Sequence, residues 1–229
     1  MSEDNVLKDL FSGEHSKRNL SAYLAVLIVI LIYHASVFWI IMGDEIQSKG
    51  DISLFSLEFE EESIFSEESR TINDGESAEM EFSVQNEVFD SHSGFGLLYI
   101  NISYTETSGE FADPCDTVSA DLSPTGAKAD WGNESNILSG MNSDCETISL
   151  KLFVYPSYNG VNNNVSGQDK QYWIDMWQDE SHGKGIFTLE IEVIVDGPPT
   201  SPIPGVSDSD EEVTVTWEAV FFDVVVSEL

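Results

Sequence analysis

The chain has 229 residues, of which 42 are acidic and only 9 basic, so its formal net charge is −33. A surface of that charge repels nucleic acid and anionic lipid headgroups, which excludes both as expected partners. Hydrophobic residues make up 41% of the chain and aromatic residues 11%, enough to bury a core, so disorder of the whole chain is excluded as well.

An uncharged stretch, residues 20–42, predicts a transmembrane helix. At 1.5 Å per residue it spans roughly 34 Å, enough to cross a hydrocarbon core of about 30 Å. A cleavable signal peptide is an alternative, but its apolar part would be shorter and would end in small residues, where this chain has Trp39 to Met42. A prepilin-type leader processed at Gly13 is a further alternative, and charged residues would then begin the mature helix.

The basic pair Lys17 and Arg18 precedes the apolar stretch, and acidic residues follow it. Because basic flanks stay in the cytoplasm, we expect residues 1–19 to be a cytoplasmic tail, 43–51 a juxtamembrane linker and 52–229 an extracellular domain. After residue 42 there are 6 bases and 38 acids, a net charge of 6 − 38 = −32. The sequence thus predicts a single-pass protein of the cell membrane, with its N-terminus in the cytoplasm.

One ionisable side chain, His34, lies inside the apolar stretch. A neutral imidazole can bond a backbone carbonyl of its own helix, but ionisable residues within membranes often face a partner. We therefore leave two interpretations open for His34, local satisfaction and an intramembrane contact with another helix.

Alternating apolar residues predict β-strands throughout the outer domain. The alternating sets are Phe55, Leu57 and Phe59; Ala78, Met80, Phe82 and Val84; Leu98, Ile100, Ile102 and Tyr104; Ile148, Leu150, Leu152 and Val154; and Phe187, Leu189, Ile191, Val193 and Val195. The first set is expected to pair with a neighbour near residues 63–72, and the turn at Asn73–Gly75 to lead into the second.

The last strand, within residues 211–226, changes phase along its length. Val213, Val215, Trp217, Ala219 and Phe221 alternate, and then Phe222, Val224 and Val226 take the opposite register. One extra residue near 220–222 would explain the change, so we predict a bulge there or a strand that crosses between sheets. The length of this strand predicts a central position.

Seven or so strands with one buried face indicate an all-β fold, an antiparallel β-sandwich of immunoglobulin-like or jelly-roll type after one N-terminal transmembrane α-helix. Two long insertions, 106–146 and 156–185, interrupt the strands. The first contains Cys115 and Cys145, which we expect to form a disulfide because thiols oxidise outside the cell. No motif identifies a family.

An aromatic group in the second insertion is a candidate binding surface. Trp173 and Trp177 are four residues apart, with Tyr172 beside them, so that on a short helix the two indoles share a face. They either plug the end of the sandwich or form an exposed platform for a sugar or a partner protein. Trp131 would join the platform if the two insertions meet.

Two histidines are weak candidates for chemistry. His92 with Asp90, and His182 with Glu180, could form a transition-metal site if their strands are neighbours. Solvated turn histidines are the more ordinary interpretation. The chain lacks the Gly-x-Ser-x-Gly elbow of serine hydrolases, so a hydrolase has the least support.

Calcium is the preferred metal hypothesis, because loop carboxylates supply hard oxygen ligands. The carboxylates concerned are Asp113, Asp116, Asp208 and Asp210. None belongs to a twelve-residue EF-hand loop, and solvated acids are the ordinary alternative. Three Asn-x-Ser sequons on the outer side are possible glycosylation sites, at Asn101, Asn133 and Asn164.

These features favour a non-enzymatic, single-pass surface protein whose sandwich mediates protein contact, as part of an envelope assembly or as an accessory subunit of a membrane complex. A glycan-binding surface module is the alternative, and an anchored hydrolase is the third hypothesis. The expected partners are the membrane and another protein, with carbohydrate open. No cofactor is expected beyond structural calcium.

Overall fold

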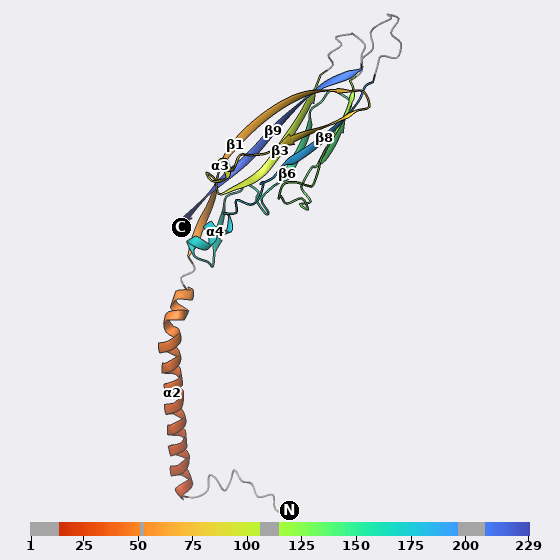
Figure 1. The fold of residues 1–229 in the computed structure, drawn as a ribbon. Helices are drawn as coiled ribbons and strands as arrows, with labels where there is room; N and C mark the ends of the chain where they lie inside the picture. Colours follow the sequence, from red (N-terminus) through yellow and green to blue (C-terminus); the bar gives the residue numbers. More distant parts are fainter. Residues whose placement is uncertain (1–13, 51–52, 106–114, 197–208) are drawn as a thin grey trace, which may run out of the picture. The chain divides into compact units, whose positions relative to one another are not determined.

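The computed structural model describes residues 14–50, 53–105, 115–196 and 209–229, and of residues 14–16 and 41–50 it describes the backbone alone. The chain divides into two compact units, Met1–Ile52 and Ser53–Leu229. The described part of the first unit is a single helix, and the second unit is built from β-sheets (Figure 1).

The helix α2 (Glu14–Gly50) has 37 residues and begins and ends outside the predicted span 20–42. Most of the segment expected as a linker, 43–51, is therefore helical. A lone glycine such as Gly43 does not end a helix, because it costs only about 1 kcal/mol relative to alanine. Within α2, Lys17–Ile40 is long and apolar enough to cross a membrane, and none of it is buried.

Nine strands of the described residues form two antiparallel sheets, ordered β6-β3-β9-β1-β7 and β2-β8-β4-β5. The strands are β1 (Leu54–Asn73), β2 (Ser77–Phe82), β3 (Gly94–Tyr104), β4 (Thr117–Leu122), β5 (Ser139–Asn142), β6 (Ile148–Phe153), β7 (Asn163–Ser166), β8 (Phe187–Ile194) and β9 (Asp210–Glu228). Two short helices, α3 (Asn86–Phe89) and α4 (Lys170–Met176), lie in the connections. The predicted antiparallel, sandwich-like arrangement is confirmed.

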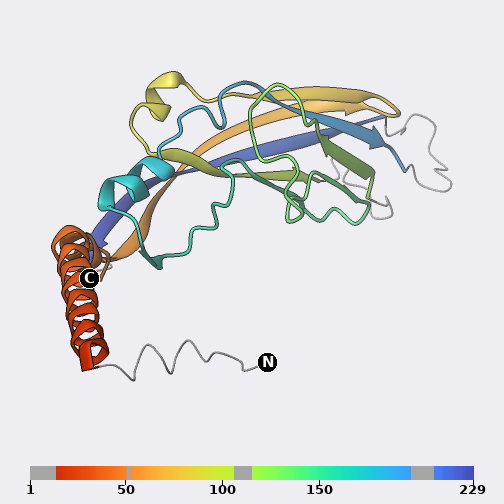
Figure 2. The ribbon, with the colours of Figure 1, turned by 90° about the horizontal axis from the view of Figure 1, so that it is seen from below.

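The strand pairs are nested in the sequence. β1 pairs with β9, β2 with β8, β3 with β6 and β4 with β5. The β3–β9 and β4–β8 ladders then join these pairs into the two sheets. β7 lies outside this series and adds to β1 only over Leu54–Leu57. Figures 1 and 2 show β1 and β9 side by side along the length of the β unit.

The inner core lies between the two sheets and contains four of the five predicted alternating sets, whereas the first set, Phe55, Leu57 and Phe59, lies in a separate cluster. Its fully buried members include Leu98, Ile100, Leu152, Leu189 and Ile191, each 0–1% exposed. Trp217 of β9 stacks on Phe82 of β2, with ring centroids 5.3 Å apart, and so joins the two sheets. Period-two patterning therefore located the core correctly.

The first strand differs from its prediction. β1 is one strand of 20 residues that pairs with β9 throughout, and not a hairpin with a turn before residue 63. No Gly, Pro, Asn or Asp lies between Phe59 and Ser63 to form such a turn. The predicted turn at Asn73–Gly75 is confirmed, with Gly75 at φ +70° and Glu76 N–H donating to the Asn73 carbonyl at 3.0 Å.

The last strand is central, as predicted, but its phase change has another cause. β9 pairs with β1 without a shift in register, so the predicted bulge at 220–222 is wrong, and β9 stays in one sheet. The irregularity lies in β3, between Phe95 and Leu97. β9 changes phase because Val220, Phe222 and Val226 face a second hydrophobic cluster on the other side of the sheet.

Gly96 lies at the bulge in β3. A Cβ at this position would lie 2.4 Å from the ring of Tyr158. The absent side chain leaves room for that ring to pack against the sheet, and the Gly96 carbonyl accepts from Val154 N–H and Tyr155 N–H at 2.9 and 3.2 Å.

The two long insertions contain short elements that the sequence pattern did not reveal. β4 and β5 lie in the first, and β7 and α4 in the second. The predicted disulfide is confirmed, since Cys115, before β4, is joined to Cys145, after β5, with an S–S distance of 2.13 Å and a Cα–Cα distance of 5.5 Å.

Candidate functional site

The outer face of the five-stranded sheet carries a second hydrophobic cluster, here called the outer cluster. Its buried members are Phe55, Leu57, Leu97, Tyr155, Tyr158, Trp177, Val220, Phe222 and Val226. Phe222 lies at its centre and is 0% exposed. Its ring stacks on Tyr158, with centroids 4.4 Å apart, and meets Phe59, Tyr155 and Trp177 edge-on.

The helix α4 covers this cluster. Asp169 begins the helix, because its carboxylate accepts from Tyr172 N–H at 2.8 Å. Tyr155 holds the other end, since its hydroxyl donates to the Met176 carbonyl at 3.1 Å. Trp177, directly after the helix, is only 8% exposed. The aromatic group of the second insertion thus covers the face of a sheet, a position close to the predicted plug.

The four aromatic residues predicted as a binding surface do not form one surface. Trp173 is half-buried beside the outer cluster, and Tyr172 is 48% exposed. Trp131 packs against the inner core instead, with its Nε1–H donating to the Ala127 carbonyl at 3.0 Å and its ring centroid 6.2 Å from that of Phe187. The structure therefore brings together the residues around α4 and separates Trp131 from them.

A polar contact closes the rim of the outer cluster. The Tyr158 hydroxyl donates to Glu61 Oε1 at 2.6 Å. Burial raises the pKa of Tyr158, and the hydrogen bond to Glu61 raises it further, so the hydroxyl keeps its proton as a donor. Beyond Glu61 the outer face is open, and a hollow of about 440 Å³ lies over β3, β6 and β9. Lys151 in this hollow lies over the ring of Phe153, 4.4 Å from its centroid.

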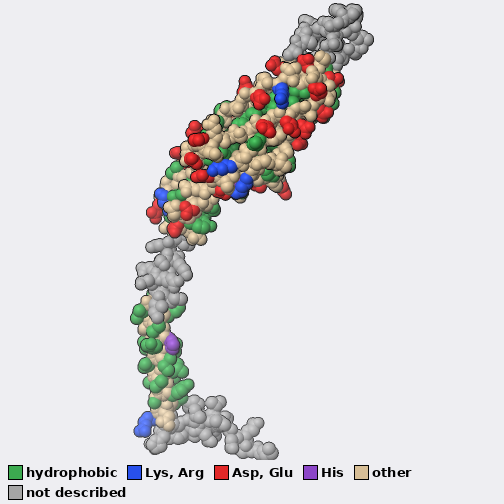
Figure 3. All heavy atoms as spheres, in the orientation of Figure 1, with side chains coloured by type: hydrophobic (Ala, Val, Ile, Leu, Met, Phe, Trp, Pro, Cys, Tyr) green, Lys and Arg blue, Asp and Glu red, His purple; other side chains and the backbone are tan. Residues whose placement is uncertain are grey.

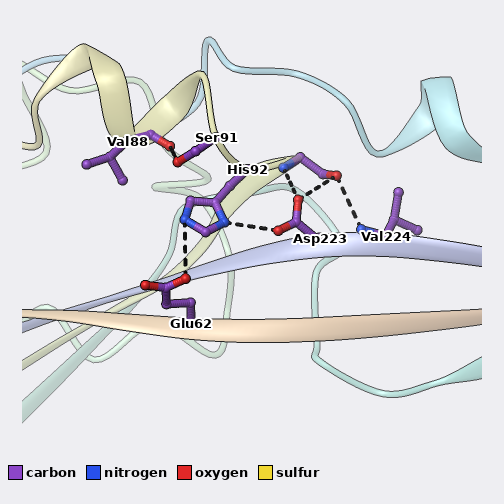
Figure 4. A network of polar contacts seen from close by, with 7 residues as sticks. Glu62, Val88, Ser91, His92, Asp223 and Val224 are labelled. Atoms are coloured by element: carbon purple, nitrogen blue, oxygen red, sulfur yellow. Dashed lines mark hydrogen bonds and ion pairs between the residues drawn. The ribbon is translucent and has the colours of Figure 1, made fainter.

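A second polar network surrounds His92 (Figure 4). Its Nδ1 lies 3.1 Å from Asp223 Oδ2, and its Nε2 lies 3.8 Å from Glu62 Oε2. The other oxygen of Asp223 accepts from the N–H of Ser93 at 2.9 Å and from its hydroxyl at 3.2 Å. Ser93 Oγ in turn accepts from Val224 N–H at 3.2 Å. This network joins the start of β3 to β1 and β9.

The His92 network differs from both sites that the sequence suggested. The two acids at His92 are Glu62 and Asp223, and not Asp90. The hydroxyl of Ser93 contacts Asp223 and not the imidazole, so these residues do not have the order of a nucleophile, base and acid. Asp90 and Glu180 do line the same hollow as His92.

The second histidine, His182, has a separate set of partners. Its Nδ1 lies 3.1 Å from Asp179 Oδ2, and Lys128 Nζ lies 3.5 Å from the same oxygen. The Ser181 hydroxyl bonds the other oxygen of Asp179 and is the largest cause that lowers the pKa of Asp179, to about 2. Burial, and then the charge of Lys128, lower the pKa of His182. Among the described residues, no group of three or more His, Cys, Asp and Glu is arranged to hold a metal ion.

The predicted calcium residues are only partly described. Asp113 and Asp208 lie outside the described residues. Asp116 is buried and its Oδ1 accepts from Asp196 N–H at 2.9 Å, whereas Asp210 is half-buried at the start of β9. Calcium therefore stays a prediction.

The three sequons differ in accessibility. Asn164 is exposed on β7. Asn101 is half-buried and accepts from the Ser149 hydroxyl at 2.8 Å, and the Asn133 amide donates to Asp130 at 3.0 Å. Asn164 thus offers the freest amide for a glycan. His34 is exposed on α2, with its ring centroid 5.8 Å from that of Tyr33.

Sequence reasoning missed Asp223 and Glu61 as partners. One signal was available for Asp223, because it is the lone acid inside the apolar run from Val220 to Val226. Glu61 lies within three consecutive glutamates, and no pattern distinguishes the one that accepts from Tyr158.

One edge of the five-stranded sheet has no strand beside it over most of its length. β7 pairs with β1 over Leu54–Leu57, and the Asn162 side chain accepts from Phe59 N–H at 3.0 Å. Among the described residues, no strand pairs with the outer side of β1 from Glu60 to Ile72. We call this stretch the open edge.

Comparison with known proteins identifies no family. No protein-family model matches the chain, and no curated protein matches its sequence. Several solved structures that are similar to it come from viruses. A nora virus chain is 12% identical over 71% of this chain and 59% of that one, with a TM-score of 0.32. The decameric BFDV capsid protein is 10% identical over 72% of this chain and 98% of that one, with a TM-score of 0.35.

A third similar structure, from mud crab dicistrovirus, is 13% identical over 73% of this chain and 70% of that one, with a TM-score of 0.30. This chain spans 59% of the length of the nora virus chain. At such identities and TM-scores, the likeness carries no argument about what this chain does.

Proposed function

We propose that this chain is a single-pass, membrane-anchored protein whose β unit makes contact with another protein outside the membrane and performs no catalysis. The apolar span of α2 is the observation that carries this proposal. Lys17–Ile40 is a helix with high hydropathy, and none of it is buried. An unburied apolar surface of that length needs a cover, and a hydrocarbon core of about 30 Å matches its length.

The charges on either side of the span support the orientation. Lys17 and Arg18 mark the cytoplasmic end, and the β unit that follows carries most of the acids. Figure 3 shows acidic side chains spread over the visible face of the β unit, with few basic ones among them. The disulfide between Cys115 and Cys145 suits an oxidising exterior.

The nested strand pairing supports a jelly roll over an immunoglobulin-like sandwich. In an eight-stranded jelly roll the first strand pairs with the last, the second with the next to last, and so on inward. With β7 set aside, the pairs β1–β9, β2–β8, β3–β6 and β4–β5 follow that order. Such folds serve as rigid scaffolds, so the role of the β unit depends on its exposed surfaces.

The open edge supports protein contact as that role, because unpaired backbone groups on a strand are a template for another chain. The glycan-binding alternative has less support. A sugar platform needs open indole faces, whereas Trp177 is 8% exposed and Trp131 packs elsewhere. The arrangement of Ser93, His92 and Asp223 gives no support to the hydrolase.

Membrane topology is tested on the full chain with a C-terminal epitope tag. We expect alkaline carbonate to leave the protein in the membrane, and protease added to intact cells to remove the tag. The double variant Lys17→Glu/Arg18→Glu should lower the fraction of outward-facing tags, because it removes the basic flank. Lys49→Glu, beyond the span, is the matched control and should leave the topology unchanged. Extraction by carbonate would contradict the anchor.

Protein contact is tested by affinity purification of the full-length chain in mild detergent, followed by mass spectrometry. We expect a stoichiometric protein partner. A His34→Leu variant then distinguishes contact within the membrane from contact through the β unit, since only the former would lose the partner. Recovery of the chain alone under gentle extraction and after crosslinking would contradict the proposed role.

A further inference from the structure

The open edge of β1 presents backbone hydrogen-bonding groups at regular spacing. Phe59 N–H points away from β9, because it donates to the Asn162 side chain. In an antiparallel ladder, alternate residues point toward opposite neighbours, and the β1–β9 register runs without a break to Asn73. The outward residues of the open edge are therefore Glu61, Ser63, Phe65, Glu67, Ser69 and Thr71.

The other edges of the described sheets are shorter, and contacts occupy part of β6 and β2, which have six residues each. On β6, Ile137 exchanges two backbone hydrogen bonds with Lys151, at 2.8 and 2.9 Å, and the Asn136 side chain accepts from Phe153 N–H at 2.8 Å. On β2, Arg70 donates to the Glu79 carbonyl at 2.8 Å. The remaining edge strands, β5 and β7, have only four residues each. The open edge is thus the exception within the described part of the molecule.

The side chains along the open edge have a distinct charge pattern. Glu60, Glu61 and Glu62 form one acidic group and Glu67 and Glu68 another. Between them Phe65 is 63% exposed on the outer face of the sheet, where it is paired with Glu218 of β9.

This pattern disfavours a second copy of the chain as the occupant. An antiparallel pair of two open edges sets outward residues opposite outward residues. Centred on Ile64, such a pair would place Glu61 opposite Glu67 and Glu60 opposite Glu68, and like charges opposite one another repel. In a parallel pair offset by one residue, glutamates 60–62 of the two copies would again lie beside one another. The chain has only 9 basic residues in all, so it has no basic strand of its own to offer.

We propose that the open edge binds an extended, basic segment of another protein, which adds a strand to the five-stranded sheet beside β1. The backbone of that segment completes the outward hydrogen bonds of β1, as in other cases of strand addition. Its lysine or arginine side chains lie opposite the two groups of glutamates, and an apolar residue near its middle covers Phe65. The proposal rests on the proposed role in protein contact and is independent of the membrane anchor.

The test uses full-length protein in mild detergent and a fluorescent peptide of about twelve residues, the length that the open edge can pair. The peptide alternates lysine and threonine around one central phenylalanine. We expect saturable binding by fluorescence anisotropy that weakens as salt is added. A peptide of the same sequence with alternate backbone amides N-methylated keeps every charge but loses the ladder, and it should bind about tenfold more weakly.

Variants of the protein distinguish peptide binding at the open edge from unspecific attraction to an acidic protein. Glu60→Lys/Glu67→Lys should weaken peptide binding by about tenfold or more, because both residues belong to the acidic groups of the edge and both are exposed. Glu190→Lys/Glu192→Lys makes the same charge change on the four-stranded sheet and should alter binding by less than about twofold. Ser63→Pro removes an outward N–H without breaking the ladder to β9, and should also weaken binding. Circular dichroism checks that each variant folds.

Equal binding of the two peptides, or equal loss in the two double-lysine variants, would overturn the proposal and leave only unspecific attraction to an acidic protein. A cellular partner whose binding survives Glu60→Lys/Glu67→Lys would also overturn it, while leaving the proposed function intact. Dimers crosslinked through the open edge would replace it with self-association.

Discussion

The two ends of β1 have the same ladder to β9 but different surroundings. At Leu54–Phe59, β7 and the Asn162 side chain bond the edge of β1 that points away from β9, and the outer cluster covers the outer face of the sheet. From Glu60 onward the outer side has no strand partner among the described residues, and every residue but Ile64 and Ile72 is exposed. We call residues 54–59 the covered end of β1 and residues 60–73 the open end, so that the open edge is the unpaired side of the open end.

The difference follows from the residues that β1 places on the outer face. Phe55, Leu57 and Phe59 supply apolar area that a cover can bury, at roughly 25 cal/mol per Å². Glu61 and Ser63 begin a polar continuation, in which Phe65 is the one large apolar side chain that a cover could bury. One continuous strand can therefore belong to a core at one end and remain an accessible edge at the other.

The largest effect is expected from breaking the covered end. Phe222→Ala should lower the free energy of unfolding by about 3–5 kcal/mol, because it removes a fully buried ring that four aromatic neighbours contact. Phe65→Ala, a ring lost from the open end, should change it by no more than about 0.5 kcal/mol. Urea unfolding followed by tryptophan fluorescence measures both. Similar losses would show that the open end is covered in solution.

Removing the disulfide tests how much this covalent link stabilises the region around the start of β9. Tyr104, opposite the start of β9, donates to the Asn142 carbonyl at 2.8 Å, three residues before Cys145. The Cys115→Ser/Cys145→Ser variant should lose roughly 3–4 kcal/mol of unfolding free energy by the chain-entropy relation. Hydrogen exchange should rise in β4 and β5 and stay slow at Phe222. A uniform rise would mean that the two ends are not energetically separate.

A smaller, pH-dependent effect is expected beside the covered end. The pKa of Asp179 is lowered from 3.8 to about 2, so its contribution to stability is present above about pH 4 and is lost as the pH falls toward 2. Because this side chain is 41% exposed, solvent screening reduces the contribution to about 1 kcal/mol. Asp179→Asn should cost that amount at neutral pH and nothing near pH 2.

The control for Asp179 is Glu180→Gln, which removes an exposed pair with Lys184 and should leave stability nearly unchanged. Unfolding is followed at both pH values for the two variants. A loss for Asp179→Asn that persists at low pH would assign it to packing and not to the charge.

The smallest effect on the free energy of unfolding is expected from the positions of acidic residues within the sheets. In the four-stranded sheet, Glu190 is opposite Glu79 on one side and Asp121 on the other. Glu190→Gln should raise the free energy of unfolding by about 0.5 kcal/mol in low salt and have no effect in molar salt. Glu67→Gln on the open end lies opposite Thr216 and should change little. Equal gains would mean that net charge, and not the position of the acids, sets the penalty.

Much of the fold could be predicted from the sequence. The five alternating sets identified β2, β3, β6, β8 and the first part of β1, because one-sided burial imposes a period of two on each. The disulfide followed from two cysteines in a domain predicted to lie outside the cell. The nested pairing could not be predicted, since it depends on which strands meet across long connections.

Two of the wrong predictions share a physical cause, which is that a strand is buried on both faces or on neither. β9 is buried on both sides near Ala219–Phe222, and this was misread as a bulge. The open end of β1 is exposed on both sides, so its glutamates suggested a break between strands. The partners of His92 come from β1 and β9, more than 25 residues away along the chain, and no local spacing indicates them.

Residue-resolved hydrogen exchange along β1, in the full-length protein in detergent, measures directly whether the open edge is unpaired. We expect slow exchange at both Ser56 and Leu57, which pair with β9 and β7. Beyond Phe59 we expect alternation, with Glu62, Ile64 and Ser66 slow and Glu61, Ser63 and Phe65 faster by at least about tenfold. Uniformly slow exchange through Thr71 would mean that the edge is already covered. Uniformly fast exchange would mean that β1 does not continue past the covered end.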